Sequence, residues 1–151
     1  MNNTNKLLFN HPHLAPRLGV SVPDTWDNAI ADALGQIVAL EEKTGLKVTI
    51  HQIKEKFGGL RLYAQINDES RALALQGVVG AIGSIRLQSG AGPGTPSEAL
   101  RAIVDQAQAA VSTLCAQCGA EGAALRNPFG WIMRLCPAHS QGAATIEGTG
   151  K

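Results

Sequence analysis

The sequence predicts an α+β protein in which an N-terminal helix packs on a β-hairpin, further helices follow, and a treble-clef-like zinc finger ends the chain. Three patterns carry this prediction. An apolar stripe of helical period follows Pro23, two alternating segments flank Gly58–Gly59, and two closely spaced pairs of metal ligands follow Leu114. These patterns occupy successive stretches of the chain, so helices and strands are expected in separate segments.

The helical stripe predicts a first long helix. Its apolar residues recur at spacings of three and four and are Trp26, Ile30, Leu34, Ile37 and Val38. Asp24 is the expected N-terminal cap with Pro23 just outside, and Gly45 stands where a left-handed C-terminal cap is expected. The charged segment Glu41–Lys43 is expected to close the polar side of this helix.

Residues 1–22 show no clear periodicity and are predicted to form an irregular N-terminal arm. His11 and His13 flank Pro12 and have no metal partner at a suitable spacing. We therefore interpret both histidines as solvent-exposed loop residues rather than ligands.

Two segments of alternating polarity predict a β-hairpin. Residues 47–53 place Val48 and Ile50 on one face, and residues 60–66 alternate in the same way. Residues 54–59 form the expected turn, in which the glycine pair is free to adopt positive φ. The exposed edge of a two-stranded hairpin favours pairing between chains, so a homodimer is an expected assembly.

The segment from Asp68 to Leu87 has an ambiguous pattern. Its apolar residues fit a helix, but three glycines at spacings of three cost about 1 kcal/mol each in a helix interior. A helix is favoured, and a broken helix or a mobile segment stays open as an alternative. A Gly/Pro-rich linker follows at 89–96.

Thr95 begins a strong helix start, with Pro96 at the first helical position and Glu98 completing a capping box. An apolar stripe then continues along the helix through Leu100, Ile103, Val104, Ala107, Val111 and Leu114.

The predicted organisation has five parts: an arm at 1–22, helix, hairpin and glycine-rich segment at 23–88, a linker at 89–96, helix plus finger at 97–141, and a flexible tail at 142–151.

The metal-ligand pairs are Cys115-x-x-Cys118 and Cys136-x-x-His139, and they use every cysteine of the chain. Two residues between thiolates let both sulfurs reach one ion at about 2.3 Å. An odd cysteine count excludes a closed set of disulfides within one chain. We predict one structural Zn²⁺ per chain, because four protein ligands leave no open position for catalysis. An iron–sulfur cluster is the rarer alternative.

A small hairpin is expected between the ligand pairs, with strands at 124–126 and 131–135 around a turn at 127–130. Pro137 suits the first turn of a short terminal helix that would carry His139 to the ion. Phe129 and Trp131 are predicted to form the miniature core of the finger. Stacking of these rings on nucleic-acid bases is the alternative.

Two parts of the chain together resemble a group of small uncharacterised proteins from bacteria and phages. The first is IKEKFGGLRLY at 53–63, and the second is the Cys-x-x-Cys-Gly, Gly130–Trp131 and Leu135-Cys136-x-x-His139 pattern. The resemblance covers about residues 24–66 and 100–140, and residues 70–95 resemble an insertion. It implies an origin in a phage or mobile element and transfers no activity.

Charge and hydropathy limit the expected location and partners. The net charge of +1 argues against an overall electrostatic attraction to nucleic acid or anionic membranes. No segment approaches the roughly 20 apolar residues that span a bilayer, and the N-terminus lacks the apolar core of a signal peptide. A cytoplasmic protein is expected.

The favoured function is a non-catalytic module that binds a protein partner. The alternative is nucleic-acid binding, in which cations of the hairpin, opposed only by Glu55, join cations of the finger: Lys54, Lys56, Arg61, Arg126 and Arg134. A solvated hairpin tip is the favoured explanation of the three hairpin cations, because three cations in eight residues are ordinary.

A metal-dependent nuclease is disfavoured because it needs a second metal site. His51, His11 and His13 are the only further histidines, and none has an acidic companion at a suitable spacing. The chain shows no nucleophile motif, P-loop or dinucleotide-binding glycine pattern, so no catalytic residues are assigned and an enzyme is not expected.

Overall fold

The computed structural model describes residues 1–67 and 94–146. Its helices are α1 (Asn3–Asn10), α2 (Asp27–Thr44) and α4 (Pro96–Val111), and its strands are β1 (Val20–Ser21), β2 (Lys47–Lys56), β3 (Gly59–Asn67), β4 (Ala124–Arg126) and β5 (Met133–Leu135). The α+β class is confirmed. The ambiguous helix at 68–87 and most of the linker lie outside the described residues. No helix in the described parts is long and apolar enough to cross a membrane.

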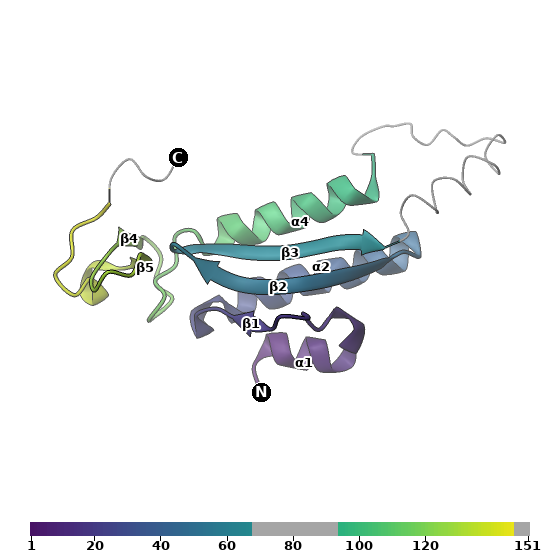
Figure 1. The fold of residues 1–151 in the computed structure, drawn as a ribbon, viewed down its shortest axis with the longest axis horizontal. Helices are drawn as coiled ribbons and strands as arrows, with labels where there is room; N and C mark the ends of the chain where they lie inside the picture. The colour runs from purple at the N-terminus through teal and green to yellow at the C-terminus, as the bar shows by residue number, and fades with distance from the viewer. Residues whose placement is uncertain (68–93, 147–151) are drawn as a thin grey trace.

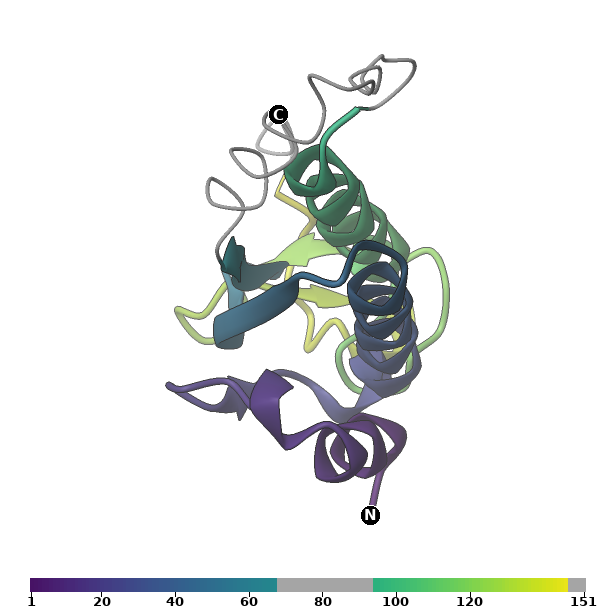
Figure 2. The same ribbon diagram turned by 90° about the vertical axis from the view of Figure 1, so that its right-hand side faces the viewer.

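The main body has two layers (Figures 1 and 2). One layer is a sheet in the order β1-β2-β3, with β1 parallel and β3 antiparallel to β2. Helices α2 and α4 pack side by side on one face of this sheet, and α1 packs against α2. The core between the layers is almost wholly aliphatic and contains Leu14, Trp26, Ile30, Ala33, Leu34, Ile37, Val48, Ile50, Ile53, Leu60, Leu62, Leu100, Ile103, Ala107 and Val111.

The predicted apolar stripe of the first long helix is confirmed, since its residues face the sheet. Asp24 does not cap the helix as expected, because residues 24–26 form a 3₁₀ turn and α2 begins only at Asp27. The C-terminal cap is confirmed. Gly45 has φ 76°, and its N–H donates to the carbonyl of Glu41 at 2.8 Å.

The hairpin is confirmed, but its strands are longer and its turn is shorter than predicted. Only Phe57 and Gly58 lie between the paired residues Lys56 and Gly59. Their φ angles are 54° and 79°, as a two-residue turn of the type favoured by strand twist requires. Of the two glycines expected to adopt positive φ, only Gly58 does so, and the other left-handed residue of the turn is Phe57 rather than Gly59.

A β-bulge changes the alternation of β2. The register to β3 shifts between Ile50 and Gln52, so His51 is the extra residue. Without this insertion, strict alternation would turn Ile53 to the face opposite Val48 and Ile50. The bulge returns Ile53 to the core, where it is fully buried.

The prediction of an irregular N-terminal arm is wrong. Asn2 caps α1 by accepting from the N–H of Asn5, and the carboxylate of Asp27 accepts from the N–H groups of Asn3 and Thr4 at 2.8 and 2.9 Å. Further along, β1 adds a short parallel strand to β2. The partners supplied by Asp27 and by β2 are 23 or more residues away, so local sequence patterns do not reveal them.

The expected exposure of Glu41 is also wrong, whereas His13 is exposed as expected. Glu41 is only 6% exposed, although it was placed on the polar side of the helix. Its carboxylate accepts from the N–H of Val48 at 2.8 Å and contacts Nε2 of His13 at 2.8 Å. These two partners satisfy a buried charge that would otherwise be costly, and they tie the N-terminal segment to α2.

Helix α4 begins as predicted. The Thr95 hydroxyl accepts from the N–H of Glu98 at 3.1 Å, and Pro96 is the first helical residue. The buried side of α4 runs through Leu100, Ile103, Ala107 and Val111, while Val104 and Leu114 are partly buried against the same core. This helix ends at Val111 and leads directly to Cys115.

Candidate metal centre

A tight turn after α4 holds the first ligand pair. The N–H of Gly119 donates to the carbonyl of Cys115 at 2.8 Å, and the N–H of Cys115 donates to the carbonyl of Ala120 at 2.9 Å. Gly119 has φ 77°, a conformation that a side chain would strain. This closed loop brings Cys115 and Cys118 to the same side of the chain.

The second ligand pair follows the small hairpin β4–β5, in which Leu125 pairs with Arg134. The predicted hairpin is confirmed, although β5 starts at Met133 rather than at Trp131. The N–H of Ala116 donates to the carbonyl of Arg134 at 2.8 Å, so the cysteine turn lies against β5. After Cys136, the predicted short helix is a single 3₁₀ turn, Pro137–His139, that returns the histidine towards the cysteines.

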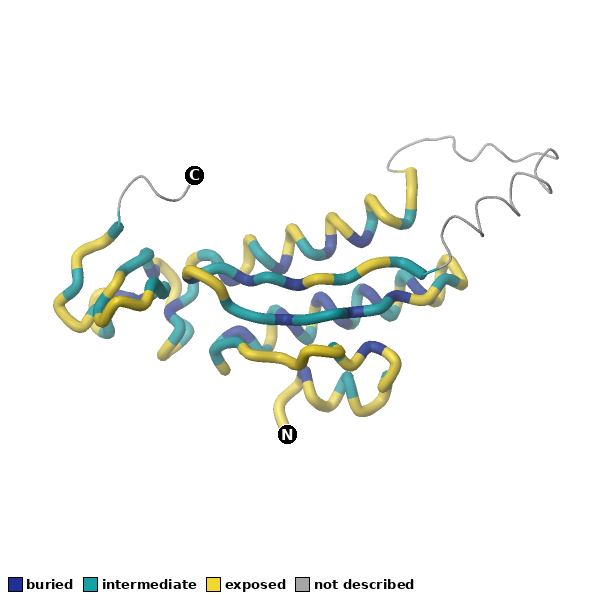
Figure 3. Tube along the Cα trace, in the orientation of Figure 1, coloured by how far each residue is buried: buried dark blue, intermediate teal, exposed yellow. Residues whose placement is uncertain are grey.

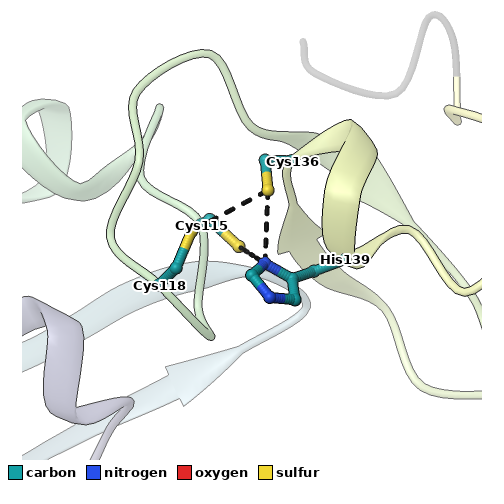
Figure 4. A group of neighbouring side chains, drawn as sticks. All are labelled: Cys115, Cys118, Cys136 and His139. Atoms are coloured by element: carbon teal, nitrogen blue, oxygen red, sulfur yellow. Dashed lines mark hydrogen bonds between the residues drawn. The ribbon is translucent and has the colours of Figure 1, made fainter.

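The four predicted ligands come together (Figure 4). The cluster consists of Cys115, Cys118, Cys136 and His139, whose ligand atoms all lie within 4.8 Å of one another. A tetrahedral ion with zinc-like bond lengths would separate two sulfurs by about 3.8 Å and a sulfur from a nitrogen by about 3.6 Å. The Sγ atoms of Cys118 and Cys136 are 3.8 Å apart, and Nδ1 of His139 lies 3.7 Å from Sγ of Cys115. The arrangement is compatible with a metal site.

The two cysteines of the first pair differ in acidity. Burial opposes ionisation of Cys115, but N–H groups of Cys136, Cys118 and Gln117 donate to its sulfur and lower its pKa to about 6. The N–H of Ala120 favours the thiolate of Cys118, but desolvation and the neighbouring thiols outweigh it and raise the pKa of Cys118. The thiolate of Cys115, which is the form that binds metal, is therefore stabilised before an ion arrives.

Within residues 1–67 and 94–146, this is the only group of three or more histidine, cysteine or acidic side chains close enough to hold an ion. His11, His13 and His51 do not belong to it. The second histidine-rich metal site that a nuclease of this kind would need is not formed by the described residues.

The expected role of the two finger aromatics is wrong. Phe129 is 80% exposed and Trp131 is 63% exposed, so neither ring forms a core. The buried cluster of the finger contains Cys115, Ala123, Leu135 and Cys136, with Met133 packed against it. Two of the cysteines and three other side chains therefore fill the small interior, and the two rings lie outside it.

The finger cations predicted to bind nucleic acid are engaged inside the protein. Arg126 donates from Nε to the carbonyl of Leu135 at 3.1 Å and from Nη1 to the carbonyl of Ala143 at 2.7 Å. Arg134 donates from Nε to the carbonyl of Gly58 at 3.0 Å, and burial lowers its pKa. The finger therefore contacts the tip of the β2–β3 hairpin (Figure 1), and the strands beside this tip carry Lys54, Lys56 and Arg61.

Thr25 is a residue of the site region that sequence patterns do not single out. Its hydroxyl donates to the carbonyl of Cys115 at 3.1 Å, and its side chain lies against Gly119. This contact joins the cysteine turn to the 3₁₀ turn before α2. The partners are 90 residues apart, and no local pattern at Thr25 predicts the contact.

No protein-family model matches the chain, and neither the curated proteins nor the solved structures contain a match. Functional inference therefore depends on the geometry described above.

Proposed function

We propose that this chain is a non-catalytic protein-interaction module whose finger is held by one structural zinc ion. Three thiolates and one imidazole at tetrahedral separations are the donor set that zinc prefers in structural sites. Four protein donors fill the shell and leave no position for a substrate. The cysteine turn, the hairpin and the turn that carries His139 follow one another in the order of a treble-clef-like finger. We also propose an origin in a phage or mobile element.

The exposed aromatic pair carries the interaction part of the proposal. Phe129 and Trp131 flank Gly130 on the turn after β4, and both rings are largely in water. Tryptophan is enriched among the residues that dominate binding energy at protein interfaces, whereas exposed large rings add nothing to the stability of an isolated chain. The site supports a protein partner that offers an apolar pocket to these two rings.

The metal and the rings are connected through the backbone of the finger. Met133 to Leu135 lead from the aromatic turn into Cys136, and the partner strand leads back towards Cys118. An ion at the cluster would hold the turn in one conformation, which reduces the entropy lost on binding. Zinc would then act on affinity indirectly, by ordering the aromatic turn.

Elemental analysis tests the metal. Protein purified without chelator is expected to contain close to one zinc per chain, and the Cys136→Ser variant much less. A ratio near zero in the wild-type protein would remove the basis of the proposal.

Site-specific photocrosslinking in the native host tests the interaction. A benzophenone side chain at position 131 is expected to give one discrete adduct that disappears on Phe129→Ala. Position 9 is the matched control, because Phe9 is also strongly exposed but lies on α1. The same set of adducts at both positions, or none at 131, would contradict the proposal. An adduct of twice the chain mass would identify the partner as a second copy.

A further inference from the structure

Among the described residues, the helices cover one face of the sheet and leave the other face without a helix (Figure 2). Buried residues on β2 and β3 alternate with partly or fully exposed ones, as Figure 3 shows. The residues on the helix-free side include Lys47, Gln52, Lys54, Lys56, Arg61 and Tyr63, and we call this set the open sheet face. Their position follows from the register, because the pairs Lys54–Arg61 and Gln52–Tyr63 alternate with the buried pair Ile53–Leu62.

The open sheet face carries four cations and no acidic residue. Glu55, which the linear sequence places among the cations, pairs directly with the buried Leu60 and so projects to the helix-covered side. Its carboxylate accepts from the N–H of Gly58 at 3.4 Å. The local charge of the face is therefore strongly positive although the chain as a whole has a net charge of only +1.

Two of these cations oppose each other. Lys54 and Arg61 are direct cross-strand partners, and like charges in such positions destabilise a sheet. Among residues 1–67 and 94–146 no carboxylate forms an ion pair with either of them; the ion pair found there joins His13 and Glu41. A bound polyanion would offset this repulsion more strongly than the screening that water and dissolved salt provide.

Aromatic rings lie within the positive field. Tyr63 is 45% exposed, with Gln52 directly opposite and Nζ of Lys54 6.0 Å from its ring centre. At the turn, Nζ of Lys56 lies 5.4 Å from the ring centre of the exposed Phe57. A ring that stacks a base beside an ammonium that neutralises a phosphate is the combination found on single-strand binding surfaces.

We propose that the open sheet face binds single-stranded nucleic acid, with Tyr63 stacking a base and Lys47, Lys54, Lys56 and Arg61 contacting phosphates. From Lys47 to Lys56 the strand spans roughly 30 Å, enough for several nucleotides. In a duplex the bases are stacked on one another, so Tyr63 could not stack on them. The open sheet face also presents no helix that could enter a groove, so we expect it to bind unpaired bases. This site is separate from the aromatic turn and does not depend on the proposed protein interaction.

Fluorescence anisotropy with labelled oligothymidylate and oligouridylate of about 15 nucleotides tests the proposal. The zinc-loaded full chain is expected to bind either or both at about 50 mM KCl and more weakly at about 200 mM. Tighter binding of one oligonucleotide identifies DNA or RNA as the source. Absence of binding to both at low salt would overturn the proposal, and so would equal affinity for a duplex of the same length.

Variants of the open sheet face distinguish the contribution of charge to nucleic-acid affinity from the contribution of base stacking. Lys54→Ala/Lys56→Ala is expected to lower affinity at least about tenfold and to reduce the steepness of the log–log salt dependence by about 1.4, since each phosphate contact contributes about 0.7. Tyr63→Ala is expected to cost about 5- to 150-fold with an unchanged salt dependence. Tyr63→Phe keeps the ring and is expected to bind like the wild type.

The matched control is Lys6→Ala/Lys43→Ala, which removes the same charge from exposed positions on α1 and α2. It is expected to leave affinity unchanged, and an equal loss would show that the face is not the site. Phe129→Ala/Trp131→Ala is also expected to retain binding, so failure of the protein-interaction proposal leaves this one standing. Unchanged circular dichroism and zinc content establish that each variant is folded.

Discussion

The two-layer body and the finger are held together in different ways. Among the described residues, the body buries fifteen apolar side chains between its sheet and helices, whereas the finger buries four residues, two of which belong to the Cys3His cluster. At the usual gain per buried apolar side chain, the body supports itself and the finger does not. The comparison teaches that apolar burial is extensive in the body, whereas the small interior of the finger includes two members of the Cys3His cluster.

Metal removal is expected to have the largest effect, and to affect the finger alone. Structural zinc contributes roughly 10–16 kcal/mol of apparent binding free energy in small fingers. Chelation is therefore expected to abolish amide protection across 115–139, while protection of α2 and β2 persists. Hydrogen exchange followed by mass spectrometry measures both regions at once. Equal protection of 115–139 with and without chelator would show that the finger folds without metal.

A cavity in the body is expected to destabilise the body and to leave the finger unaffected. Ile37 is fully buried on α2, so Ile37→Ala should lower the free energy of unfolding by about 2–5 kcal/mol, and Ile37→Val by only about 0.5–1.5 kcal/mol. Urea unfolding monitored by circular dichroism measures the loss. Zinc content per chain should remain unchanged in both variants. A parallel loss of zinc would mean that the finger depends on the body.

The junction between the two regions is tested at Gly58. An alanine Cβ there would strike the side chain of Leu125, in addition to the strain of positive φ. Gly58→Ala is expected to cost about 0.5–1.5 kcal/mol more than backbone strain alone, because the terminal methyl of Leu125 must leave its preferred rotamer. Gly45→Ala is the control, because Gly45 has a similar φ and open space around it, and should cost about 1–2 kcal/mol. Equal losses in thermal unfolding would show that the tip and the finger do not contact each other tightly.

The smallest effect is expected at the N-terminal attachment of the body. Burial opposes ionisation of Asp27, but hydrogen bonds from Thr4 and Asn3 outweigh it and lower the carboxyl pKa below its ordinary value of 3.8. Because the folded pKa lies below the unfolded one, the stabilisation is present above pH 3.8 and is lost as the pH falls through the folded pKa.

Asp27→Asn is accordingly expected to cost about 0.3–1 kcal/mol at neutral pH, the usual contribution of a carboxylate at a helix N-terminus. The difference from the wild type should shrink once the pH is below the folded pKa. Thermal unfolding as a function of pH measures it. A difference that stays constant into acid would show that the charge of Asp27 contributes nothing.

Local patterns in the sequence determined most of the elements and all four members of the metal cluster. The Cys-x-x-Cys and Cys-x-x-His spacings constrain ligand geometry within a few residues, and the Thr95 cap, the Gly45 cap and the helical stripe of α2 act over one or two turns. Each of these features is specified by neighbours in the chain. For that reason each feature can be predicted from the sequence without knowledge of the fold.

Only the tertiary structure decided which side chains are exposed and which regions meet. It buried Glu41 against Val48 and exposed Trp131. It also turned Glu55 away from the cations beside it and joined Arg134 to Gly58, 76 residues away. These outcomes depend on contacts between distant segments and on the register of one bulged strand, so the period of the local sequence carries no information about them. The four-residue cluster was therefore predictable from spacing alone, whereas both proposed binding surfaces became visible only in the fold.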